Sequence, residues 1–160
     1  MRVKMTYNTW YLAIMKADIL REVKMETSYL GAKNLQGSMY DKMRTTDADE
    51  EYLDSKVTSA WAEVRLLLSE FERPLTDEDD VTGDMVMKLV TPMTMPAAAV
   101  EDMMVAARRL MVLRVTAEWM RNIDMNASNN FTMQCQVEYD RLIHARCQRR
   151  RQGGVRMQPF

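Results

Sequence analysis

His144 is the only histidine of the chain, and it is the first candidate in a search for catalytic chemistry. Asp140 lies four residues before it and Cys147 three residues after it, so a helix would place the three side chains on one face. Such a set could be an imidazole oriented by a carboxylate beside a thiol, or half of a metal site. A zinc site needs four ligands, and the other cysteine, Cys135, is three helical turns away. We therefore favour His144 as a partly exposed residue of an arginine-rich helix.

Four consecutive acidic residues, Asp77, Glu78, Asp79 and Asp80, form the densest cluster of carboxylates. The run lacks the ligand pattern and the final glutamate of a calcium-binding loop, so a solvated acidic loop is the favoured interpretation. The phosphate-binding motifs G-x-G-x-x-G and G-x-x-x-x-G-K-[ST] do not occur in the sequence. These patterns predict no catalytic residues, no metal and no cofactor, and they indicate a protein that is not an enzyme.

Charge is unevenly distributed, although the formal net charge is only −1. Residues 41–84 hold 14 acids and 5 bases, whereas residues 141–160 hold 6 arginines, one histidine and no acid. Arginine side chains suit phosphate and carboxylate groups. Three roles stay open for the C-terminal arginines: complementing the dipole of a helix C-terminus, docking on an acidic protein surface, and binding nucleic acid.

Methionine is unusually frequent, with 17 residues. Several lie in residues 84–95, where apolar residues alternate imperfectly and predict a short strand or extended arm. Methionine is common in cores and also on surfaces that adapt to a partner, so both interpretations stay open. A lone strand must pair with another segment, which could be residues 2–5 or a second copy of the chain. The candidate residues of an inter-subunit arm are Met85, Met87, Leu89, Met93 and Met95.

The positioning elements follow from hydrophobic periodicity, which predicts an all-α fold. We expect a four-helix bundle-like domain over residues 1–148 and a flexible, basic C-terminal tail over residues 149–160. The third helix carries few charges and is expected to be central in the bundle. We expect Asp47 to cap the second helix, and Ser128, Asn129 or Asn130 to cap the fourth. The predicted helices cover residues 9–30, 47–72, 97–123 and 130–151, with the extended arm at 84–95.

No membrane segment is expected. The longest uncharged stretch near the middle, residues 89–100, contains two prolines and is too short to span a bilayer. The N-terminal region lacks a signal-peptide pattern, because Lys16, Asp18 and Arg21 interrupt its apolar residues. Two cysteines do not form a disulfide framework, which favours a reducing compartment.

Four stretches give the chain a resemblance to a known class of protein. The first helix closes on T-S-Y-L-G-A-K (27–33), and the second opens with Y-D (40–41) followed by T-T-D-A-D-E-E (45–51). The third helix contains V-T-A-E-W (115–119), and the fourth ends in arginines. In these stretches the chain resembles small helical head–tail connector (adaptor) proteins in the virions of tailed phages and prophages of Bacteroidetes-type bacteria.

The resemblance implies a ring of about twelve copies below the portal, assembled in the bacterial host cytoplasm, with DNA passing nearby without sequence-specific binding. It implies that the C-terminal segment docks on the portal or a neighbouring virion protein, through Arg146, Arg149, Arg150, Arg151, Arg156 and Phe160. The acidic loop at Asp77–Asp80 would then repel DNA phosphates in the channel. Two alternatives remain: another tail-completion or baseplate component, and a small nucleic-acid-binding or regulatory protein that uses the arginine-rich helix.

Overall fold

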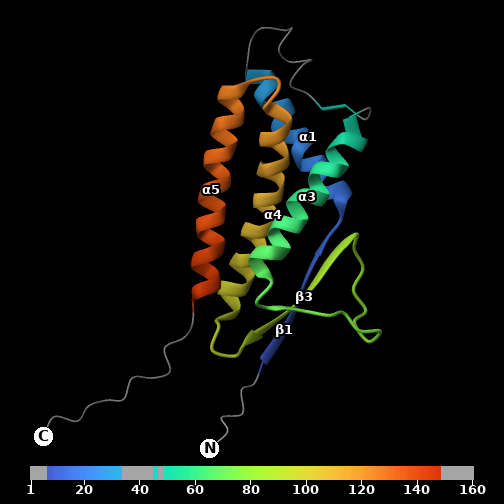
Figure 1. The fold of residues 1–160 in the computed structure, drawn as a ribbon, viewed down its shortest axis with the longest axis vertical. Helices are drawn as coiled ribbons and strands as arrows, with labels where there is room; N and C mark the ends of the chain where they lie inside the picture. The colour runs from blue at the N-terminus through green and yellow to red at the C-terminus, as the bar shows by residue number, and fades with distance from the viewer. Residues whose placement is uncertain (1–6, 34–44, 47–48, 149–160) are drawn as a thin grey trace, which may run out of the picture.

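The computed structural model describes residues 7–33, 45–46 and 49–148 of the chain. In order, the elements are β1 (Tyr7–Ile14), α1 (Lys16–Lys33), α3 (Glu50–Leu68), β2 (Glu72–Arg73), β3 (Met85–Pro92), α4 (Ala97–Met120) and α5 (Met125–Cys147). The fold is therefore mainly helical with a small antiparallel sheet, and the all-α prediction is only partly correct. Figure 1 shows the four helices standing side by side above the sheet.

The prediction of a helix from residue 9 is wrong at its start, because residues 9–14 belong to strand β1 and the helix begins at Lys16. The side chains of β1 alternate, with Leu12 and Ile14 buried and Tyr7, Thr9 and Tyr11 exposed. Aromatic and β-branched residues favour extended backbone when a partner strand is available. That partner is β3, which pairs antiparallel along the whole of β1, from Tyr7 opposite Pro92 to Ile14 opposite Met85.

Strand β3 lies in the middle of the sheet, in the order β1-β3-β2. The predicted extended stretch at 84–95 is thus a strand over eight of its residues, Met85–Pro92. It pairs within this chain with Tyr7–Ile14, a partner that the sequence did not suggest. Residues 2–5 lie outside the described residues.

Helix boundaries differ from the predictions mainly at the ends. Helix α1 continues to Lys33, past Gly31, and α3 begins at Glu50 and ends at Leu68. Helix α5 begins five residues earlier than predicted, because the carboxylate of Asp124 accepts hydrogen bonds from the backbone N–H groups of Asn126 and Ala127. Asp47 lies outside the described residues.

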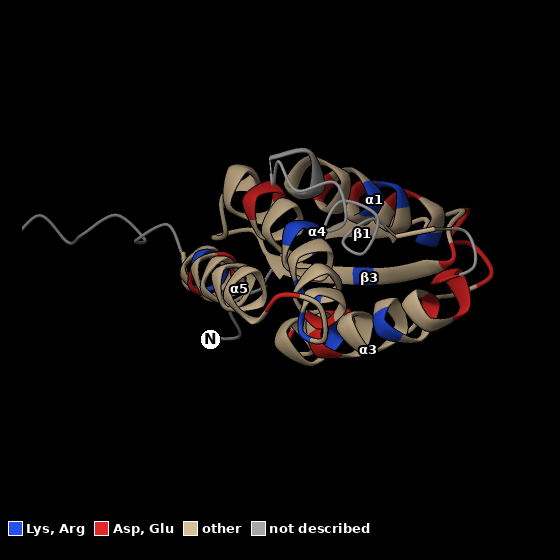
Figure 2. Cartoon of the chain, turned by 90° about the horizontal axis from the view of Figure 1, so that it is seen from above, with Lys and Arg blue, Asp and Glu red and all other residues tan. Residues whose placement is uncertain are grey.

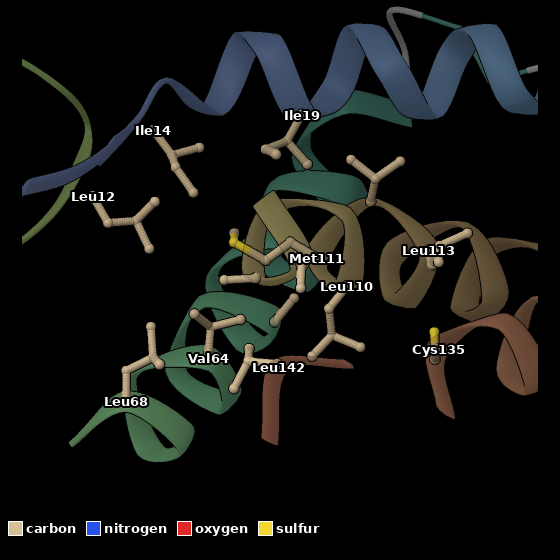
Figure 3. Close-up of a cluster of buried hydrophobic side chains, with 14 of the residues drawn as sticks. Leu12, Ile14, Ile19, Val64, Leu68, Leu110, Met111, Leu113, Cys135 and Leu142 are labelled. Atoms are coloured by element: carbon tan, nitrogen blue, oxygen red, sulfur yellow. The ribbon is translucent and has the colours of Figure 1, made fainter. Parts of the chain in front are cut away.

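Helix α4 is the centre of the molecule, as its apolar sequence predicts. Figure 2 looks along the helices and shows α4 between α5 on one side and α1 and α3 on the other. The buried core joins all of these elements with the inner face of the sheet, and Figure 3 shows part of it around Met111. The fully buried residues of α4 include Val100, Met103, Ala106, Ala107, Met111, Val112, Val115 and Met120.

Ion pairs across the helix surfaces fix the register of the bundle. Helix α1 is joined to α4 by Glu22–Arg108 (2.5 Å) and Glu26–Arg109 (2.6 Å). Helix α5 is joined to α4 by Arg141 and Asp102. Such half-exposed pairs add little stability individually, so they specify alignment more than they hold the fold together.

Candidate interaction surfaces

The acidic loop predicted at residues 77–80 is present, but its four carboxylates are not equivalent. The side chain of Asp79 is only 5% exposed. It accepts hydrogen bonds from Lys88 Nζ (2.8 Å), from Tyr11 Oη (2.5 Å) and from the backbone N–H of Thr76 (2.7 Å). Asp79 therefore holds the loop on the outer face of the sheet, and it is not available to a partner.

The electrostatics of this cluster follow from these contacts. The hydrogen bond from Lys88 is the main reason that the pKa of Asp79 lies well below its usual range, with the Tyr11 hydroxyl and the Thr76 backbone adding to the effect. The same contact with Asp79 raises the pKa of Lys88 and the pKa of Tyr11. The carboxylates of Asp77, Glu78 and Asp80 stay exposed and form the free part of the acidic loop.

The proposed inter-subunit arm lies mostly in the core of this chain. Met85, Met87, Leu89 and Met95 are at most 4% exposed, and only Met93 is exposed, at 54%. The four buried side chains cannot contact a neighbouring subunit, so the arm interpretation is corrected for them. For Met85, Met87 and Leu89 the physical reason is the pairing of β3 with β1, which turns alternate side chains inward under the helices.

The described arginines of the fourth helix are already paired. Arg146 donates to the carboxylate of Glu70 (2.9 Å) and to the backbone oxygen of Leu67 (3.0 Å). Arg141 pairs with Asp102 and Glu138, and its contact with Asp102 raises its pKa. Arg146 is therefore a contact between α5 and the end of α3, which corrects its assignment to the docking tail. Arg149, Arg150, Arg151, Arg156 and Phe160 lie outside the described residues.

The candidate catalytic residues of α5 do not form an enclosed site. Asp140, His144 and Cys147 are all exposed on α5. Cys135 is buried against α4, and burial is the main reason that its pKa rises to about 11. In the described part of the chain, no group of three or more potential metal-ligating side chains comes together.

Two surfaces were not predicted from the sequence. One is a groove of about 660 Å³ beside α5, next to which Met133 and Val137 are 67% and 65% exposed. The spacing of four between these two residues was a detectable signal of a second apolar stripe. Apart from them, the groove is lined by Leu30, Asp124, Asn126, Ala127, Asn130, Phe131 and Gln134.

The second unpredicted surface is the outer edge of the sheet. Strand β1 is the outermost strand, and no other described strand pairs with its far side. The sequence could not indicate this edge, because residues 9–14 also fit the spacing of a helix.

The stretches that carry the resemblance lie mainly at one end of the bundle. The end of α1, the start of α3 and the end of α4 meet at the top of Figure 1. There the ring of Tyr52 lies 6.3 Å from the ring of Trp119, centroid to centroid. The arginine-rich end of α5 lies at the other end of the bundle.

No described helix combines the length and the apolar character that crossing a membrane requires. Comparisons with known proteins give no match: no family model, no curated protein and no solved structure is similar to this chain.

Proposed function

We propose that this chain is a structural subunit of a head–tail connector of a tailed phage or prophage, which forms a ring between portal and tail. One observation carries the proposal beyond the resemblance. The acidic loop and the C-terminal end of α5 lie on opposite sides of the molecule, in the views of both Figure 1 and Figure 2. Residues 149–160, which follow α5, carry four arginines and no acid.

Opposite charges on opposite sides favour a head-to-tail contact between neighbouring copies. Such a heterologous contact closes into a ring when the rotation between copies divides a full turn. In this proposal, Arg149, Arg150 and Arg151 of one copy meet Asp77, Glu78 and Asp80 of the next. Complementary charges mainly set the register and the rate of assembly, while affinity depends on additional packing.

The nucleic-acid alternative receives no comparable support. Arg141 and Arg146 are engaged by carboxylates of the same chain. A phosphate-binding helix would present such guanidinium groups to solvent along one face.

The experiment is native mass spectrometry of the purified full chain at low salt. We expect a closed oligomer of the 18.7 kDa subunit. The double variant Asp77→Asn/Asp80→Asn should reduce the oligomer, because it removes two exposed acids of the loop. The double variant Glu101→Gln/Asp140→Asn removes two exposed acids elsewhere and should leave the oligomer intact. An equal loss of oligomer in the two double variants would count against the proposal. So would the absence of a closed oligomer of the unmodified chain, both alone and with its portal protein.

A further inference from the structure

The outer edge of β1 is the surface from which a second interaction can be inferred. One hydrogen bond between β3 and the residue before β2 shows which backbone groups of β1 point toward this outer edge. The backbone N–H of Val90 donates to the oxygen of Phe71 at 2.8 Å, toward β2. In an antiparallel sheet, the N–H and C=O groups of one residue point to the same side. Val90 therefore directs no backbone hydrogen bond toward β1.

Thr9 lies opposite Val90, so its own backbone groups must point away from β3. Because backbone groups of alternate residues along a strand point to the same side, those of Tyr11 and Ala13 also point away from β3. No strand or loop in the described part of the chain hydrogen-bonds to the backbone of Thr9, Tyr11 or Ala13 on that side. These residues form an open row of backbone donors and acceptors, which we call the β1 edge.

The two edges of the sheet differ in how they resist further pairing. The β2 edge is two residues long, both charged, and Pro74 follows it. Short length, charge and proline are the features that prevent an edge from adding another strand. The β1 edge belongs to a strand that is eight residues long and contains no charge and no proline. Only the β1 edge is therefore suited to strand addition.

We propose that the β1 edge pairs with the β1 edge of a second copy, in an antiparallel, two-fold arrangement. The protected β2 edge cannot act as the complementary surface, so a head-to-tail extension of sheets is disfavoured. Self-pairing of an uncharged strand brings no like charges together. A two-fold contact is closed, because each copy uses its single open edge.

This contact is separate from the head-to-tail contact of the proposed ring, which uses the acidic loop and the C-terminal segment. An edge contact of this length is smaller than a standard protein–protein interface. We therefore expect a pair that dissociates on dilution.

The test is sedimentation velocity of the full chain over a concentration series, in high salt to suppress charge-driven assembly. The unmodified chain should shift from one subunit to twice 18.7 kDa as concentration rises. Thr9→Pro removes an N–H that points only to the open edge, so it should abolish the pair while the helical circular dichroism stays unchanged. Thr9→Val keeps the N–H group and should pair like the unmodified chain.

Thr9→Lys gives a second route if the proline variant does not fold. It keeps the N–H group but places a lysine on the edge of each copy, which should weaken pairing by at least tenfold in dissociation constant. A folded proline or lysine variant that pairs as well as the unmodified chain would overturn the proposal. So would an unmodified chain that remains a monomer throughout, and the edge would then be assigned to a strand of a different protein.

Discussion

At the scale of single residues, Asp79 shows how neighbouring acids acquire different roles. It contacts the backbone of its own loop at Thr76, strand β1 at Tyr11 and strand β3 at Lys88. A carboxylate that accepts several hydrogen bonds is stabilised in its charged form. Its neighbours Asp77 and Asp80 have the same side chain but remain exposed. In sequence the four acids are alike, and only the cross-strand position of Lys88 and Tyr11 distinguishes Asp79.

Asp79 also predicts a pH dependence of stability. Because its pKa is lowered in the folded state, its contribution is complete above the unfolded value of about 4 and is lost as the pH falls below it. Asp79→Asn should therefore lower the melting temperature at neutral pH, and the difference from the unmodified chain should shrink toward pH 2. Thermal unfolding followed by circular dichroism across the acid range measures this. Asp80→Asn is the matched control, and an equal effect in that variant would contradict the assignment.

The two cysteines give a second prediction at the residue scale. Cys135 is buried and its pKa is raised to about 11, whereas Cys147 is exposed. The thiolate is the reactive form, so Cys135 should be inert in the folded chain at neutral pH. Titration with a thiol reagent should detect one cysteine in buffer and two in denaturant. Cys147→Ser should abolish the reaction in buffer, and a persistent signal there would show that Cys135 is accessible.

At the scale of elements, the start of α5 depends on Asp124. Its carboxylate accepts from two backbone N–H groups, while Ser128 donates to the backbone oxygen of Ala117 at 2.9 Å. Asp124→Ala should cost about 1 kcal/mol in the free energy of unfolding, the usual loss for a helix cap. Asn129→Ala and Asn130→Ala should change it by less than about 0.5 kcal/mol, as exposed positions generally do. Urea unfolding of the three variants measures the difference, and equal losses would place the helix start elsewhere.

The burial of strand β3 can be tested by replacing two methionines that are close in sequence. Met87 is 1% exposed in the core, and Met93 is 54% exposed beyond the strand. Met87→Ala should lower the free energy of unfolding by about 2–5 kcal/mol, because it removes buried methylene groups and leaves a cavity. Met93→Ala should cost less than about 0.5 kcal/mol. Chemical denaturation gives both free energies of unfolding. If Met87→Ala cost no more than Met93→Ala, the interpretation of residues 84–95 as an arm that leaves the domain would be favoured instead.

Periodicity predicted α3, because its apolar residues recur on one helical face, whereas the scarcity of charge on every side predicted that α4 is central. Leu53, Val57, Ala60 and Val64 have the three- and four-residue spacing of one helical face, and all four are buried in α3. The same spacing continues to Leu67, but that side chain is only partly buried and Leu68 is buried in its place. The failure to predict strand β1 has a specific cause. Leu12, Ile19 and Val23 fit a helix with Met15, although Leu12 and Ile14 also fit a strand. Met15 is 49% exposed and marks the junction between strand and helix, which local spacing does not reveal.

At the scale of the whole molecule, the two proposed contacts depend differently on salt. The Debye length falls from about 10 Å at 0.1 M to about 3 Å at 1 M, so contacts between exposed charges weaken. Backbone pairing along the uncharged β1 edge is insensitive to that change. We expect high salt to dissociate the ring into two-fold pairs, and dilution to separate the pairs. Light scattering across both series measures this, and a ring that resists high salt would show that the acidic loop does not hold it.

The sequence by itself determined the mainly helical character, the phase of α3, the central position of α4 and the uneven distribution of charge. These features are local, because each depends on residue types within a few turns of one segment. Tertiary structure alone decided that residues 7–14 form a strand, that β3 is buried and that Asp79 and Arg146 are engaged. Each of these depends on partners far apart in the chain, from 9 residues for Lys88 with Asp79 to 85 residues for Tyr7 with Pro92. A strand or a buried ion pair has no stability without its partner, so the pattern of one segment cannot specify it.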